Sequence, residues 1–239
     1  MLRGYRRALA AGDEATAEGL IAWLGGQPNV AATVKRAAGI RGELDHDGAL
    51  AFLSARGYRR FVLYGHSLGA VKVVFYQGTK HRPDVAGVIA SSAPRQFYAA
   101  RAIEQPDFPE RMAEAEAMVA SGRGEEFVWA PTSGALGVFT ARTYVSKYGR
   151  HEQNDVRKQA AELTVPLMTT AGGKESESFH VHARELAEAA GPELGTWHIV
   201  EGANHQYSGR EDVLVGLAAS WLSRVSHQPA VPAEGRSRA

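Results

Sequence analysis

Ser67 lies at the centre of the sequence G-H-S-L-G at 65–69, which matches the pattern G-x-S-x-G. The apolar stretch 61–64 precedes this motif and a helix-forming stretch follows it, so the serine is predicted to occupy a sharp turn between a strand and a helix. We expect a positive φ at Ser67, because such a turn strains the backbone and lifts the hydroxyl above the sheet. Gly65 and Gly69 are expected to leave room where the backbone is crowded. A serine held in this way is typical of a nucleophile.

A serine hydroxyl attacks a carbonyl carbon only when a base takes its proton, and the attack leaves negative charge on the carbonyl oxygen. The backbone N–H of Leu68 is predicted to begin the following helix, where unpaired donors and the helix dipole favour that oxyanion. His66 is expected to line the turn rather than act as the base, because its neighbour Ser67 points elsewhere. The base and an acid that orients it must therefore come from other parts of the chain.

With this motif and these flanks, residues 43–224 resemble the α/β-hydrolase superfamily, in particular its small esterases and serine-aminopeptidase-like members with a helical cap. The sequence G-H-S-L-G-A at 65–70 is the common form of the nucleophile turn there. The resemblance implies the chain order Ser, acid, His. It implies His205 as the base, because the sequence G-A-N-H at 202–205 follows a predicted strand and precedes a predicted helix, as G-A-x-H does in the family.

The acid implied by the resemblance is Glu175. Similar hydrolases carry the pattern G-x-x-D after the preceding strand, and counting from Gly172 leads to this glutamate, although Asp is commoner there. Glu177 lies two residues further on and is the alternative acid. Either carboxylate would also suit the first turn of an ordinary helix. A triad of this kind needs no metal and no organic cofactor.

Strands and helices alternate around these residues. The alternation predicts an α/β fold, a mostly parallel sheet with helices on both faces. An apolar stripe at helical spacing before Gly57 predicts the first clear helix. The expected strands are 59–64, 85–91, 165–170 and 196–200, and the expected later helices are 68–77, 178–190 and 210–224.

Residues 95–162 interrupt the alternation and are too long for a simple crossover. We interpret them as a helical cap, with helices expected at 111–120, 139–148 and 155–163. The predicted hydrolase core is then 1–94 together with 163–225. Residues 226–239 are rich in Pro, Ser, Arg and Ala and are expected to be a disordered tail.

The start of the chain departs from the family. The second oxyanion donor usually comes from a His-Gly loop after the third strand, and residues 1–42 contain no His-Gly. We therefore expect an apparently N-terminally truncated fold, a feeble esterase, and an open edge at 61–64 that favours aggregation or pairing into a homodimer. Residues 20–24 fit either a strand that fills the gap, with Gly25 and Gly26 supplying amides, or a helix that ends at Gly25.

Composition excludes several classes of protein. The 239 residues include 27 basic and 26 acidic side chains, a net charge of +1, so no field of one sign favours nucleic acid or an anionic membrane. The absence of cysteine excludes disulfides, thiolate nucleophiles and Cys-based zinc sites. No apolar run reaches the ~18 residues that span a bilayer, and acidic residues after Met1–Arg7 rule out a signal peptide. His180 and His182 lack a third ligand nearby and are interpreted as structural, and we expect a cytoplasmic protein.

The sequence thus predicts a serine hydrolase that cleaves a small-molecule carboxylic ester, or an amide or thioester, through an acyl-enzyme on Ser67. Cofactor-free perhydrolase chemistry would use the same triad. A competing hypothesis is a catalytically weak or inactive binding or regulatory protein with a hydrolase-like core. The aromatic residues of the predicted cap fit its own core better than the walls of a pocket; they are Phe97, Tyr98, Phe127, Trp129, Phe139 and Tyr144.

Overall fold

A four-stranded parallel sheet forms the centre of the protein. The computed structural model describes residues 42–132, 135–152 and 154–225. The strands β1 (Phe61–His66), β2 (Val85–Ser91), β5 (Leu167–Gly172) and β6 (Gly195–Val200) lie in the order β1-β2-β5-β6, and every neighbouring pair is parallel. The predicted parallel sheet is confirmed. Its carboxyl edge carries the residues after each strand, where open α/β sheets place their ligands.

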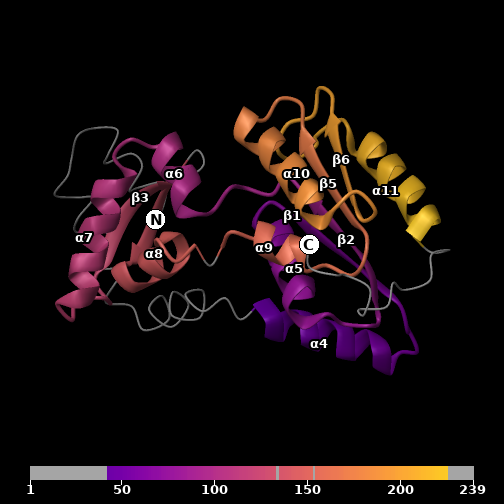
Figure 1. Ribbon diagram of the computed structural model, residues 1–239, viewed down its shortest axis with the longest axis horizontal. Coiled ribbons are helices and arrows are strands. Elements are labelled where there is room, and N and C mark those ends of the chain that lie inside the picture. Colours follow the sequence, from indigo (N-terminus) through magenta and orange to yellow (C-terminus); the bar gives the residue numbers. More distant parts are fainter. Residues whose placement is uncertain (1–41, 133–134, 153, 226–239) are drawn as a thin grey trace.

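Helices cover both faces of this sheet (Figure 1). On one face lie α5 (Leu68–Lys80), α9 (Arg157–Ala161) and α10 (Glu177–Ala190), whose apolar side chains share one buried cluster with β1 and β2. On the other face α11 (Glu211–Val225) buries Trp221 and Val225 against Ile89 and Met168. The first described helix, α4 (Gly42–Ala55), packs against α5 and is followed by Gly57 at φ 95°, as its predicted role at the helix end requires.

The inserted segment forms a second lobe beside the sheet (Figure 1). It contains α6 (Tyr98–Glu104), α7 (Phe108–Ala120), the antiparallel hairpin of β3 (Phe127–Thr132) and β4 (Ala135–Thr140), and α8 (Ala141–Tyr148). A buried cluster that includes Phe108 and Met112 is its core. We call this lobe the cap.

The cap differs from the prediction in two respects. It is not purely helical, because the aromatic and β-branched residues around 127–140 favour strands, and α8 begins at Ala141 rather than at 139. Thr140 explains that start, since its Oγ1 accepts a hydrogen bond from the Thr143 N–H at 3.2 Å. In addition α9, predicted as cap, packs against the core helices α5 and α10.

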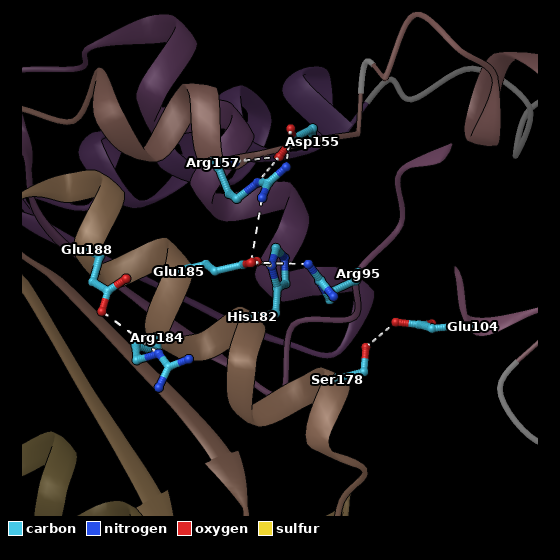
Figure 2. A network of polar contacts seen from close by, with 9 residues as sticks. All are labelled: Arg95, Glu104, Asp155, Arg157, Ser178, His182, Arg184, Glu185 and Glu188. Atoms are coloured by element: carbon cyan, nitrogen blue, oxygen red, sulfur yellow. Dashed lines mark hydrogen bonds and ion pairs between the residues drawn. The ribbon is translucent and has the colours of Figure 1, made fainter. Parts of the chain in front are cut away.

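One carboxylate on α10 holds both connections between the cap and the core. Figure 2 shows Glu185 between Arg95, on the segment that enters the cap, and Arg157, on the segment that returns from it. Arg95 Nη2 lies 3.1 Å and Arg157 Nη1 3.6 Å from Glu185 Oε1. Arg157 is also paired with Asp155, at 2.7 Å from Nε to Oδ1. His182 lies beside Glu185, and burial lowers its pKa, so the imidazole is neutral at neutral pH.

We expect Glu185→Gln to lower the free energy of unfolding by about 1–3 kcal/mol, because two arginines then lose a charged hydrogen-bond partner. Glu188→Gln is the matched control on the same helix: its pair with Arg184 is 3.8 Å long and exposed, and should be worth well under about 1 kcal/mol. Urea unfolding followed by circular dichroism measures both. Equal losses in the two variants would contradict the role assigned to Glu185.

Several predictions concern residues outside the described part of the chain. They are the strand or helix at 20–24, the amides of Gly25 and Gly26, and the tail 226–239. Within the described residues β1 is an edge strand that pairs with β2 alone, and Tyr64 on it is exposed.

Candidate active site

Ser67 occupies the sharp turn between β1 and α5. Its φ is 56° and its ψ is −125°, so the predicted positive φ is confirmed. The Ser67 N–H donates to the carbonyl of Ser91 at 2.8 Å, which ties the turn to the end of β2. Leu68 follows as the first residue of α5, where backbone N–H groups have no acceptor within the helix.

Gly65 is the residue that makes this turn sterically possible. A Cβ built on it would lie 2.2 Å from the carbonyl oxygen of Gly69, and no real structure tolerates so close an approach. The expectation for Gly69 itself is wrong, because in the described part of the chain a Cβ at that position meets nothing within 4 Å. The first glycine of the motif is therefore required for space, and the second is not.

We expect Gly65→Ala to destabilise the fold by about 1–3 kcal/mol or to displace the turn, because the new methyl group overlaps backbone that cannot move aside. Gly69→Ala should be neutral or stabilising by up to about 1 kcal/mol, since alanine is the better helix former. Chemical unfolding and reactivity of Ser67 should separate the two variants. Similar losses would mean that the turn does not depend on this contact.

His205 links Ser67 to Glu175. Its Nε2 lies 3.0 Å from Ser67 Oγ, and its Nδ1 lies 2.5 Å from Glu175 Oε1. The carboxylate can only accept, so Nδ1 carries the proton and Nε2 presents its lone pair to the serine hydroxyl. The Glu175 side chain is 3% exposed and that of His205 is 36% exposed. The buried Glu175 carboxylate thus fixes one edge of the imidazole, while the other edge faces Ser67 and is partly exposed to solvent.

The loops that carry the acid and the histidine are joined through backbone. Gly173 N–H donates to Val200 and Lys174 N–H to Ala203, both at 2.8 Å. A Cβ on Gly172 would lie 2.7 Å from the carbonyl oxygens of Ala203 and Asn204, so only glycine allows this approach.

Two polar side chains set the course of the histidine loop. Asn204 Oδ1 accepts from the N–H groups of Gln206 and Ser208, both at 3.0 Å. His66 Nε2 donates to the carbonyl of His205 at 2.6 Å. The expectation that His66 lines the turn is therefore met by a specific contact, and this residue supports the loop that carries His205.

The second oxygen of Glu175 lies in a polar network that the sequence did not reveal. Oε2 accepts from Ser92 Oγ and from the Gly172 N–H, both at 2.6 Å. Ser92 Oγ lies 3.0 Å from the Tyr207 hydroxyl, which lies 2.7 Å from Thr170 Oγ1. Because Ser92 has one proton and gives it to the carboxylate, Tyr207 donates to Ser92. Burial raises the pKa of Tyr207, which keeps this proton on the phenol.

We expect Ser92→Ala to lower the free energy of unfolding by about 1–3 kcal/mol, because it removes one of the two donors to Glu175 Oε2 and takes the Ser92 acceptor away from the buried Tyr207 hydroxyl. The turnover number should also fall, since the acid is held less firmly. Ser223 lies on the exposed face of α11, where its hydroxyl donates to the carbonyl of Ala219, so Ser223→Ala is the control and should change little. Unfolding in urea is the measurement, and an unchanged midpoint for Ser92→Ala would contradict the network.

The alternative acid and the histidine pair lie elsewhere. Glu177 is 82% exposed and lies 3.5 Å from His180 Nδ1, so the structure does not bring it to His205. His180 Nε2 donates to the carbonyl of Gly172 at 2.9 Å, whereas His182 is buried beside Glu185. The two histidines therefore contact different partners. Within the described residues no group of three His, Asp or Glu side chains is arranged to hold a metal.

A cavity of about 540 Å³ lies over Ser67 and His205. Core and cap both line it, and its remaining walls are Leu68, Pro94, Gln96, Arg101, Lys147, Tyr148, Lys174, Glu175, Ser176 and Phe179. None of the six aromatic residues considered from the sequence is among them. Tyr98, Phe139 and Tyr144 pack in the core of the cap instead. The predicted donors Gly25 and Gly26 lie outside the described residues, whereas Leu68, the other predicted donor, begins α5 and lines the cavity.

In the part of the chain that the structure describes, no helix has the length and apolar character needed to cross a membrane.

Sequence comparison gives little guidance. The family described as "BREX system ATP-binding protein BrxC/D" matches residues 1–62, about a quarter of the chain. That segment lies mostly outside the described residues, and its described part contains α4 and the start of β1. A search of the curated proteins found no match.

Solved structures resemble the chain over most of its length. The monoacylglycerol lipase of Paleococcus ferrophilus is 19% identical, with a TM-score of 0.56 over 78% of this chain and 74% of that one. Est1E from Butyrivibrio proteoclasticus is 12% identical, with a TM-score of 0.50 over 75% of this chain and 68% of that one. A structure of Est1E with bound ferulic acid is similar to the same degree, at 11% identity and a TM-score of 0.50 over 76% and 67%. Together with the parallel sheet, the strained serine turn after β1 and the cap between β2 and β5, this likeness shows that the chain has the α/β-hydrolase fold.

Proposed function

We propose that this protein is a serine hydrolase that cleaves a small-molecule carboxylic ester through an acyl-enzyme on Ser67. The observation that carries the proposal is the continuous contact from Ser67 Oγ through His205 to the buried carboxylate of Glu175, beside a cavity large enough for a small ligand. A strained serine, a histidine in the required tautomer and a buried acid have the mutual geometry of a Ser-His-acid triad.

In the proposed reaction Ser67 Oγ attacks the ester carbonyl while His205 Nε2 takes the hydroxyl proton. Glu175 stabilises the imidazolium that results, and the Leu68 N–H donates to the oxyanion. The tetrahedral intermediate collapses as His205 returns the proton to the departing alkoxide, which leaves as the alcohol. Water then attacks the acylated Ser67 with His205 again as base, and the carboxylic acid is released. His205 returns each proton that it takes, and the alcohol and the acid leave in turn, so the reaction needs no cofactor.

An ester is the favoured substrate because an alkoxide is a much better leaving group than the anion of an amine, so an ester is cleaved more easily than an amide. The solved structures named above, a monoacylglycerol lipase and Est1E, suggest the same chemistry for this chain. The BREX description does not lead to a proposal of ATP binding, because residues 1–62 contain no G-K-S or G-K-T sequence of the kind that holds phosphates in a P-loop.

The test is labelling of the folded protein with a fluorophosphonate probe, followed by peptide mapping, together with hydrolysis of p-nitrophenyl esters of rising acyl length. We expect label on Ser67 alone and turnover of at least the shorter esters. A folded protein that takes no label and hydrolyses no ester would overturn the proposal and favour a binding or regulatory protein. Label on a serine other than Ser67 would also count against it.

A further inference from the structure

Arg101 on α6 is buried in the wall of the cavity over Ser67. The residue is 4% exposed, and no other arginine or lysine of the described chain is buried to this degree. Cationic side chains are almost never buried to this degree unless an anion accompanies them. The position of Arg101 therefore calls for a partner of negative charge.

The described residues supply no such partner. The guanidinium of Arg101 lies 4.1 Å from the ring centre of Tyr148, and Nη1 lies 3.5 Å from the amide oxygen of Gln105. Its Nε is buried without a hydrogen bond, and no carboxylate of the described residues pairs with it. Arg95 and Arg157, which are more exposed, both have carboxylate partners. An unpaired buried charge is costly, and a bound anion would remove that cost.

Lys147 on α8 adds a second positive charge to the same wall. It lines the cavity, is half-buried, and has its Nζ near the rings of Phe139 and Tyr148. Burial lowers the pKa of Lys147, and the positive charge of Arg101 lowers it further. Two cations thus repel one another across a space that no described acidic group neutralises.

The one carboxylate among the cavity-lining residues of the described chain, Glu175, forms no ion pair with Arg101 or Lys147. Both oxygens of Glu175 are engaged, one by His205 and the other by Ser92 and Gly172. Lys174 contributes a further positive charge to the lining. Gln96, also in the wall and 7% exposed, has an amide oxygen without a hydrogen-bond partner. The cavity wall therefore carries the positive charges of Arg101, Lys147 and Lys174, and it includes the unpaired amide oxygen of Gln96.

We propose that Arg101 and Lys147 bind an anionic group, a carboxylate or a phosphate, on the substrate whose ester bond Ser67 attacks; the inference rests on the function proposed for Ser67. Arginine presents a planar fork of donors that matches both anions, and lysine adds a point charge. The substrate class is then an ester that carries a negative charge elsewhere in the molecule, held between the cationic wall of the cap and the triad of the core.

The activity test uses two matched pairs of esters. On the acyl side, p-nitrophenyl hemiglutarate is compared with p-nitrophenyl valerate; on the leaving-group side, a carboxyphenyl acetate is compared with phenyl acetate. In at least one pair kcat/KM should be about 10-fold or more higher for the anionic member, the size of effect expected of a charged hydrogen bond. A full-length protein that hydrolyses both pairs without preference for the anion would overturn the inference.

Variants assign the preference to its residues. Arg101→Met should abolish the ratio of anionic to neutral kcat/KM, Arg101→Lys should restore part of it, and Lys147→Met should reduce it. Arg150→Met is the control, because Arg150 is an exposed cap arginine paired with Glu116 and does not line the cavity. A purely structural role of Arg101 would lower both rates equally and leave the ratio unchanged, which would count against the proposal. Lys147→Met gives the same readout if Arg101→Met does not fold.

Binding separates this inference from the proposed function. Calorimetry with glutarate and with inorganic phosphate should detect binding to the wild type and to Ser67→Ala, and much weaker binding to Arg101→Met. The ligand that binds with the higher affinity shows whether the site prefers a carboxylate or a phosphate. If the protein binds the anion but takes no fluorophosphonate label, the result would support the anion site and contradict the proposed hydrolase function. If the protein is labelled and hydrolyses esters but neither binds the anions nor prefers anionic esters, the result would contradict the anion site alone.

Discussion

Ser67→Ala is expected to lower kcat for p-nitrophenyl ester hydrolysis by about 10⁴-fold or more and to abolish fluorophosphonate labelling. The alanine has no oxygen to form the acyl-enzyme, and His205 then has no hydroxyl to activate. Loss of the nucleophile from such a triad leaves only the contribution of substrate binding and the oxyanion donor. Steady-state kinetics with intact-mass detection of the label is the measurement.

The control for this variant is Ser176→Ala, because Ser176 lines the same cavity without contacting His205. It should keep its label and lose no more than about 3-fold in kcat, since it takes no part in the proton transfer. The hydroxyl of Ser67 contacts His205, whose side chain is partly exposed, so Ser67→Ala should unfold close to the wild-type midpoint. Retained turnover in Ser67→Ala, or equal loss in both variants, would remove Ser67 from the mechanism.

Glu175→Gln is expected to lower kcat by about 10³–10⁴-fold while leaving the fold intact. The reason lies in the contacts of the second oxygen. Ser92 and the Gly172 N–H both donate to Oε2, so a glutamine will keep its amide oxygen there and turn its NH₂ group towards His205 Nδ1. That arrangement favours the tautomer with the proton on Nε2, which cannot accept a proton from Ser67.

The matched variant Glu177→Gln changes the same side chain two residues away. Because Glu177 is exposed and its one ion pair among the described residues is with His180, its loss should alter kcat by less than about 2-fold. Rates measured on one ester over a pH series compare the two. A large loss in Glu177→Gln with none in Glu175→Gln would reverse the assignment of the acid.

The sequence alone was sufficient for the parts of this protein that depend on neighbours along the chain. A strand, a G-x-S-x-G turn and a helix follow one another directly, so local sterics dictate the positive φ of Ser67. The alternation of apolar strands and amphipathic helices likewise predicts the parallel sheet, since each segment can bury its apolar side in only one way. Local signals were weaker in the cap, where the apolar run at 127–140 suits strand as well as helix and the hairpin was missed.

Only the tertiary structure decided what depends on residues far apart in the chain. Counting from Gly172 favoured Glu175 and left Glu177 as the alternative, whereas the contacts of Glu175 with His205 and with Ser92, 83 residues away, depend on the packed chain. In the sequence nothing distinguishes Arg101 from other arginines on helices. Its proposed role follows from its burial in a cavity wall that residues of other elements also form. Sequence patterns record local geometry, whereas burial and charge pairing are set by the whole packed chain. The serine turn could therefore be predicted from the sequence, whereas the hydrogen-bond network around Glu175 and the positive charges of the cavity wall could not.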